Sequence, residues 1–226
     1  MYDIIKHYPK VSKELVEKYS KLDESASINE CMKVNHAMSN DLRPVWPGMK
    51  CCGVALTVCS RPGDNLMLHK AISIAQPGDV IVMDCGDYNE CGGMFGGIMS
   101  NACKTRGVVG LITNGCVRDT MMQKQIGFPV WSKGISVRRS TKHEPGTINH
   151  QVIVGGIVVN PGDLIFADND AIVVVPREDA EEVYEKALAR EKHEDEMLVK
   201  VQTDGTATFQ NFAKNFAELS LSEEED

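Results

Sequence analysis

The stretch from residue 51 to residue 176 is divided into short apolar runs by glycine, proline, aspartate and asparagine residues. Short apolar runs bounded by such turn residues are typical of β-strands. Helical patterns separate the first runs, and a charged helical pattern follows the last. This order predicts an α/β chain built as a β-rich sandwich with helices on the outside, rather than a doubly wound sheet. The predicted strands are CCGVALTVC, DVIVMD, VVGLIT, PVWSKGISVR, QVIVGGIVVN, DLIFAD and AIVVVP, and the helices between them are NLMLHKAISIA, MFGGIMSNACKTRG and DTMMQKQIG.

Helical patterns also mark both ends of the chain. Leu15, Tyr19 and Leu22 recur at spacings of three to four, which predicts an N-terminal helix. Ser27 and Glu30 have the spacing of a capping box and predict a second short helix. The segment REDAEEVYEKALAREKHEDEMLVKVQ predicts a long C-terminal helix with charges over most of its surface. We predict a single domain over residues 1–220, followed by a disordered acidic tail at residues 221–226.

The tripeptide Pro-Gly-Asp occurs three times, and two of its copies lead directly into an apolar run. Proline fixes φ and glycine supplies a positive φ, so each copy predicts a tight turn. The three copies are Pro62–Asp64, Pro77–Asp79 and Pro161–Asp163.

Charge and composition narrow the classes of partner. The formal net charge is −8, and the tail SLSEEED contributes half of it. No Lys/Arg-rich run is present, which argues against nucleic acid as a partner, although a small anion at a local positive site remains open. No apolar stretch suits a signal peptide or a membrane span. Eight cysteines without a C-x-x-C pair indicate reduced thiols rather than a zinc site, so we predict a cytoplasmic protein.

The segment GGIMSNACKTRGVVGLITNGCVRD holds the most informative motif. Gly96 and Gly97 open a predicted helix, where unpaired N–H groups and the helix dipole favour an anion. A strand and the loop Asn114–Cys116 follow, and then Arg118 and Asp119. One helix and one strand return the chain beside its start, so we expect these two side chains to face the helix N-terminus.

These groups together suit the cleavage of a carbon–carbon bond next to a 2-oxo acid. Backbone amides could bind the carboxylate, Arg118 could hold the enolate oxygen, and Asp119 could ligate a hard divalent cation. The plainer alternatives are a surface ion pair, or an Asp119 that caps the helix TMMQKQ.

Several linked motifs give the chain a family resemblance over about residues 40 to 200. They are GVALTV with PGDNLMLHKAI, PGDVIVMD, GLITNGCVRD with IGFPVWSKGIS, and EPGTINHQVIVGGIVVNPGDLIFADNDAIVVVP. In these motifs the chain resembles the class II pyruvate aldolases that cleave 4-hydroxy-4-methyl-2-oxoglutarate and 4-carboxy-4-hydroxy-2-oxoadipate, a group that shares its fold with the regulator of ribonuclease activity A. The resemblance implies a swivelling β/β/α-type sandwich, trimers or hexamers with sites at subunit interfaces, and Mg²⁺ or Mn²⁺.

The resemblance also implies roles for individual residues. The arginine that matches Arg118 contacts the pyruvate oxygen, and the aspartate that matches Asp119 carries the metal. The amides that match Ile98 and Met99 hold the pyruvate carboxylate. An acid on the neighbouring subunit's C-terminal helix supports the metal through water, and the candidates here are Glu191 and Glu194.

The chain departs from the family pattern at two positions. The aldolases usually read Asp-x20-Arg-Asp, and the first position here is Gly97. A variant with glycine there has an acid three residues after the second aspartate, where this chain has Met122. Asp87 or Glu90 could rebuild the metal site, or the chemistry could be altered.

We therefore expect a metal-assisted lyase that releases pyruvate, by a retro-aldol reaction or by decarboxylation of oxaloacetate. The carboxylate of the substrate would lie on the amides from Gly97 to Met99. The alternative is a non-catalytic member of the family that regulates through protein contacts.

Overall fold

The computed structural model describes residues 3–86 and 92–219, and a mixed β-sheet carries the fold. The strands are β1 (Arg43–Pro44), β2 (Cys51–Cys59), β3 (Asp79–Asp84), β4 (Gly93–Phe95), β5 (Gly110–Val117), β6 (Val130–Ile135), β7 (Thr147–Ile148), β8 (Val152–Val154), β9 (Ile157–Val159), β10 (Leu164–Ala167) and β11 (Ile172–Val175). Their order in the sheet is β1-β6-β5-β3-β2-β10-β11; β4 pairs with β5, β7 pairs with β2, and β8 and β9 form a separate hairpin. Neighbours from β2 to β6 are parallel, whereas β10 and β11 are antiparallel.

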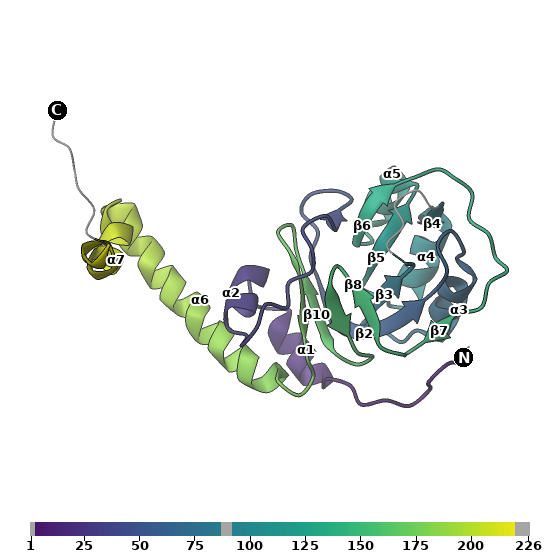
Figure 1. The fold of residues 1–226 in the computed structure, drawn as a ribbon, viewed down its shortest axis with the longest axis horizontal. Helices are drawn as coiled ribbons and strands as arrows, with labels where there is room; N and C mark the ends of the chain where they lie inside the picture. Colours follow the sequence, from purple (N-terminus) through teal and green to yellow (C-terminus); the bar gives the residue numbers. More distant parts are fainter. Residues whose placement is uncertain (1–2, 87–91, 220–226) are drawn as a thin grey trace. The chain divides into compact units, whose positions relative to one another are not determined.

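Helices connect the parallel strands, and two more helices follow the last strand, as Figure 1 shows. They are α1 (Lys13–Tyr19), α2 (Ser25–Glu30), α3 (Leu66–Ile74), α4 (Gly97–Thr105), α5 (Thr120–Ile126), α6 (Ala180–Thr203) and α7 (Ala207–Glu218). This confirms the predicted α/β class with outer helices, an N-terminal helical segment and a long C-terminal helix. No helix in the described part of the chain is both long and apolar enough to cross a bilayer.

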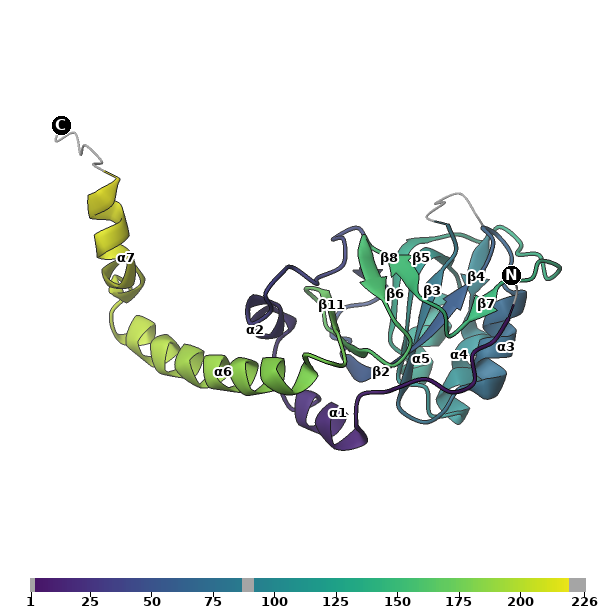
Figure 2. The same cartoon turned by 60° about the horizontal axis from the view of Figure 1, so that its bottom comes forward.

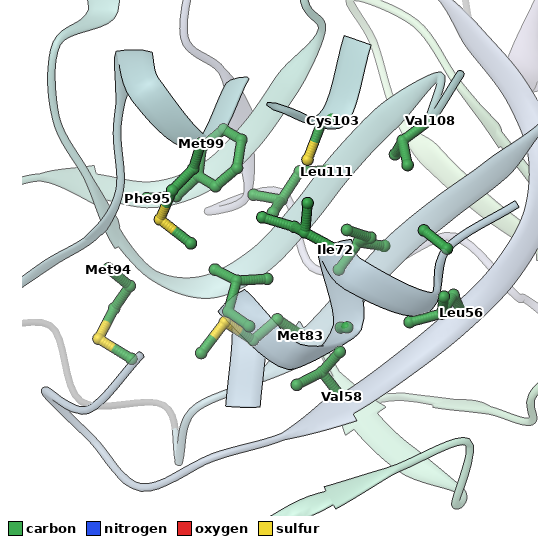
Figure 3. Packing of buried hydrophobic residues seen from close by; sticks show 14 of the residues in the cluster. Leu56, Val58, Ile72, Met83, Met94, Phe95, Met99, Cys103, Val108 and Leu111 are labelled. Carbon is green, nitrogen blue, oxygen red and sulfur yellow. The ribbon is translucent and has the colours of Figure 1, made fainter. Parts of the chain in front are cut away.

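Both faces of the parallel strands are covered, which explains why DVIVMD is apolar almost throughout. Side chains alternate between the faces of a strand. Ile81 and Met83 therefore pack with α3 and α4 on one face, and Figure 3 shows part of this cluster. Val80 and Val82 pack on the other face with residues of β8, β9, β10 and β11. The two layers fix the register of β3, because a slip of one residue would exchange the faces.

The three Pro-Gly-Asp turns have the predicted positive φ at glycine, with φ of 79° at Gly63, 90° at Gly78 and 92° at Gly162. The aspartates do more than close the turns, because all three are buried. Asp79 accepts the backbone N–H three residues before it at 2.8 Å, and Asp163 accepts the equivalent N–H at 2.9 Å. Each of these two carboxylates thus takes the place of a backbone carbonyl as the acceptor for that N–H group.

The sequence-based prediction was wrong about three local features. Met94 and Phe95, expected at the start of a helix, belong instead to β4, which pairs with β5. Asn114–Cys116, expected as a loop, continues β5, because β4 and β6 both pair with its end. The capping box at Ser27 does not form, since α2 begins at Ser25, whose N–H donates to the Asp168 carboxylate at 2.8 Å.

The chain divides into two compact units, Met1–Ala187 and Leu188–Asp226. The first holds the sheet and α1 to α5, and the second holds most of α6 and all of α7. The sequence did not suggest α7. The single domain predicted over residues 1–220 stays a prediction, and the tail at 221–226 lies outside the described residues.

Candidate functional site

Arg118 follows the last residue of β5 and lies against the glycines that surround β4. Its backbone N–H donates to the Phe95 carbonyl at 2.9 Å, which continues the pairing of β4 with β5. A Cβ built on Gly93 would lie 3.0 Å from the Cβ of Arg118. Glycine at this position therefore lets the arginine side chain pass close to the backbone. The guanidinium end stays accessible, because the side chain is 42% exposed.

The side chain of Asp119 caps α4 rather than the helix that follows it in sequence. Its Oδ2 accepts the Gly97 N–H at 3.0 Å, whereas its side chain makes no capping hydrogen bond to α5. The backbone of Asp119 is left-handed, with φ of 59°. Aspartate is one of the few residues that tolerate this conformation. Asp119 thus stands at the N-cap position of α5, as the alternative predicted, but its carboxylate makes no hydrogen bond there and instead meets the positive end of the α4 dipole.

The two side chains meet at Gly96. A Cβ built on this glycine would lie 2.5 Å from Asp119 Oδ2 and 3.3 Å from Arg118 Nε. Arg118 Nε and Asp119 Oδ2 are themselves 3.9 Å apart. Thus the structure places both side chains beside the start of α4.

The next two amides of α4 precede its internal hydrogen bonds. The first of those bonds runs from Ser100 N to Gly96 O, at 3.0 Å. The N–H groups of Ile98 and Met99 therefore belong to the open first turn. The Ile98 side chain is 85% exposed and the Met99 side chain is buried. This turn, together with Arg118, has the donors that a carboxylate and an enolate oxygen require.

The donors at this site do not fit a hard divalent cation within the described residues. Mg²⁺ and Mn²⁺ prefer several oxygen ligands. Here the described carboxylate is that of Asp119, and it already accepts the Gly97 N–H. Across residues 3–86 and 92–219, no group of three His, Cys, Asp or Glu side chains is arranged to hold a metal ion.

The remaining acids predicted for the metal lie outside the described residues or in the second compact unit. Asp87 and Glu90 lie outside the described residues. Glu191 and Glu194 belong to the second compact unit, where Glu194 pairs with Arg190 at 2.8 Å. Their part in a metal site stays a prediction.

Two residues of α5 take part in the site, and sequence reasoning missed what they do. Met122 lies over Gly97, where a built Cβ would overlap its sulfur. Gln123 is buried and donates from Nε2 to the Arg118 carbonyl at 2.9 Å, while its N–H donates to the Asp119 carbonyl at 3.0 Å. A polar residue that faces the core from a short helix is a weak sequence signal, since only the fold shows which backbone groups it hydrogen-bonds to.

A second polar pocket lies at the carboxyl ends of the same strands, on the other face of the sheet. Asp84 lies two residues after Val82, and Asn114 lies two residues after Ile112, so each shares a face of the sheet with that residue. Asp84 and Asn114 line a cavity of ≈ 540 Å³ together with Lys133. The Asn114 amide donates to Asp84 Oδ1 at 2.8 Å. Because these polar groups already satisfy one another in part, the Arg118 site remains the stronger candidate for enolate chemistry.

Comparison with known proteins places the chain in a family. Residues 21–174 match the family described as RraA-like, aldolase/RraA. A Halalkalibacterium halodurans protein, provisionally named 4-hydroxy-4-methyl-2-oxoglutarate aldolase, is 34% identical over 155 residues, which cover 68% of this chain and 73% of that protein.

Solved structures agree with this placement. An uncharacterized Pseudomonas syringae protein has a TM-score of 0.79 at 24% identity, with 89% of this chain and 98% of that chain covered. The Streptomyces coelicolor protein RraAS2, described as an unusual member of the RNase ES inhibitor RraA protein family, has a TM-score of 0.75 at 26% identity, covering 84% of this chain and 98% of that one. The resemblance predicted from the ordered motifs is confirmed, and the chain belongs to the RraA-like, aldolase/RraA family.

Proposed function

We propose that this chain is a lyase that cleaves a carbon–carbon bond of a small 2-oxo acid and releases pyruvate. The observation that supports this most is the meeting of Arg118 and Asp119 at Gly96, beside the open first turn of α4. Such a turn favours a carboxylate, and a guanidinium favours the oxygen on which enolate charge develops. The aldolase name carried by a relative at 34% identity points to the same reaction class.

In the proposed reaction the substrate carboxylate lies on the N–H groups of Ile98 and Met99, and the 2-oxo oxygen lies at the Arg118 guanidinium. When the C3–C4 bond of oxaloacetate breaks, carbon dioxide leaves and the electron pair moves through C3 to the 2-oxo oxygen. The guanidinium stabilises the resulting enolate. Protonation of C3 then gives pyruvate.

A retro-aldol substrate needs one further group. In 4-hydroxy-4-methyl-2-oxoglutarate a base removes the proton of the 4-hydroxyl, the C3–C4 bond breaks, and the same enolate forms with a second pyruvate as the leaving carbonyl compound. The Asp119 carboxylate is the described base at the site. A bound divalent cation would supply Lewis-acid stabilisation of the enolate. We assign it no step, because the described donors do not fit it.

The test is pyruvate release from oxaloacetate and from 4-hydroxy-4-methyl-2-oxoglutarate, measured with coupled lactate dehydrogenase in Mg²⁺, in Mn²⁺ and in chelator. Arg118→Ala should lower kcat by a factor of about 10² to 10³, because it removes the donor to the enolate. Arg118→Lys should recover a part, since lysine keeps the charge without the planar fork. Wild-type turnover in Arg118→Ala would overturn the proposal.

A regulatory role is the second candidate, and the thioether over Gly97 favours it. A site that lacks the second carboxylate could retain the fold and bind a protein partner instead. The related Streptomyces coelicolor protein RraAS2 is described as an unusual member of the RNase ES inhibitor RraA protein family. If the wild type forms pyruvate and Arg118→Ala abolishes this activity, the result decides for the lyase. Absence of turnover in every metal, together with inhibition of a purified RNase E-type ribonuclease, would decide for the regulator.

A further inference from the structure

The N-terminal segment covers a cavity that is separate from the Arg118 site. Figure 2 shows the segment leaving α1 and running to the region of α3 and β7. Three backbone hydrogen bonds fix it, from Ile5 N to Ile148 O at 3.1 Å, from Ile148 N to Asp3 O at 3.2 Å and from Val11 N to Gly162 O at 3.0 Å. Between these anchors the segment forms one wall of a cavity of ≈ 360 Å³.

The cavity has an apolar side that belongs to three parts of the chain. Ile4 and Ile5 come from the N-terminal segment, Leu56 from β2 and Ile74 from α3. Such a surface suits the apolar part of a small ligand, because its burial removes hydrocarbon from water.

The charged groups at the cavity are mostly cations. Lys6, Lys10 and Lys70 line it with a single acid among the described residues, Asp79. Lys10 Nζ lies 3.5 Å from Asp79 Oδ1, so this pair neutralises itself. Lys6 and Lys70 make no ion pair with a described acid. Two positive charges therefore remain at one cavity of a chain whose net charge is −8.

Asn149 supplies a further polar group to the same cavity. Its backbone is left-handed, with φ of 61°, and its side chain is 4% exposed. Nδ2 donates to the Ile5 carbonyl at 2.8 Å, which holds the N-terminal segment in place. Oδ1 has no hydrogen-bond partner among the described residues, although buried amide oxygens are normally paired.

We propose that this cavity binds a small organic phosphate monoester. The dianionic phosphate lies between the ammonium groups of Lys6 and Lys70, and the organic group lies on Ile5 and Ile74. Two ammonium groups match the charge of a phosphate monoester near neutral pH, because its second pKa is about 6. The cavity shares no described lining residue with the Arg118 site, so the inference does not depend on the proposed lyase activity.

The test uses phenyl phosphate as the probe, at about pH 8, where it is a dianion. Isothermal titration calorimetry should show saturable binding of phenyl phosphate to the full chain. Inorganic phosphate and phenol should each bind at least tenfold more weakly. The double variant Lys6→Gln/Lys70→Gln should weaken phenyl phosphate at least tenfold. Lys21→Gln/Lys124→Gln, which removes two exposed lysines elsewhere, should bind like the wild type, and both double variants should keep the wild-type Tm.

Four results would contradict the inference. The first is no saturable binding of phenyl phosphate to the wild type. The second is wild-type affinity in Lys6→Gln/Lys70→Gln. The third is loss of binding in Arg118→Ala, which would place the probe at the other site. An affinity for inorganic phosphate equal to that for phenyl phosphate would likewise contradict the role given to Ile5 and Ile74.

Discussion

At the scale of single residues, Gly96 sets how closely the functional side chains approach α4. Its φ of −150° is open to any residue, so the requirement for glycine is one of space. A methyl group there would press on Asp119 Oδ2 at 2.5 Å. The carboxylate would have to move, and the Gly97 N–H would lose its acceptor. Gly97 is limited in the same way, but by the side chain of Met122, from its Cβ to its sulfur, rather than by a functional group.

Gly96→Ala should therefore reduce lyase turnover by about tenfold or more, because displacing the Asp119 carboxylate also moves the neighbouring guanidinium. Gly205→Ala is the matched control, since a Cβ at that position meets nothing within 4 Å. The measurement is pyruvate release, with circular dichroism to check the fold. Equal turnover in the two variants would contradict the role given to this close contact.

Asp64 is a buried residue whose ionisation should contribute to stability in acid. Burial acts to raise its pKa, but hydrogen bonds from the His143, Leu66 and Glu144 N–H groups and from the Thr141 hydroxyl lower it overall. A lowered folded-state pKa means that the stabilisation is present above the unfolded pKa of about 4 and is lost as pH falls through the folded value.

Asp64→Ala should lower the free energy of unfolding by about 3 kcal/mol at neutral pH, because four donors lose a charged acceptor. Urea unfolding at a series of pH values should show the wild type and the variant converging below about pH 4. Asp204→Ala, at an exposed turn, is the control and should cost less. A constant difference across that range would show that the carboxylate charge is not the cause.

At the scale of elements, sequence patterns predicted most strands and helices but not the pairing that completes the site. Apolar runs in the sequence predicted β2, β3, β10 and β11, because these strands are buried and buried strands are rich in apolar residues. β4 and the end of β5 contain glycine and asparagine, and they are strands because neighbours pair with them. The meeting of Arg118 with the start of α4 was predicted from chain reversal, whereas the contacts of Met122 and Gln123 depend on how α5 is rotated.

Gln123→Met tests whether α5 positions the turn at Arg118. Methionine keeps the volume but loses the hydrogen bond from Nε2 to the Arg118 carbonyl. We expect a loss of about 1 to 3 kcal/mol in unfolding free energy and a lower kcat, because the part-buried Arg118 carbonyl loses this donor. Gln125→Met, on the exposed side of α5, should leave both unchanged. Wild-type kcat in Gln123→Met would show that the turn holds its geometry without this bond.

At the scale of the whole molecule, the site is open in one chain. Arg118 and Asp119 are 42% and 47% exposed, and the described residues hold no group of three His, Cys, Asp or Glu side chains that could bind a metal ion. A second copy of the chain is therefore the expected source of the missing groups. The family resemblance suggests that they come from α6, with Glu191 and Glu194 as candidates. The sequence could not choose between these, because both lie on a charged helix where most acids are solvated.

Mixing variants tests this expectation of a site shared by two copies. Glu191→Gln/Glu194→Gln and Arg118→Ala should each have low turnover alone. Refolded together they should recover activity above either parent, because mixed oligomers contain some intact sites. The readout is pyruvate release across mixing ratios, with size-exclusion chromatography to confirm mixed assembly. Full activity of the glutamate variant alone would contradict a catalytic part for α6.

The contact between Met122 and Gly97 has a consequence for how such a chain can change over generations. Any side chain introduced at position 97 first collides with the thioether, whereas a smaller residue at 122 removes the obstacle. The two substitutions are therefore epistatic, and only one order of them avoids an unfavourable intermediate. A lineage, or an engineer, that places a second carboxylate beside Asp119 by way of position 97 must begin at position 122.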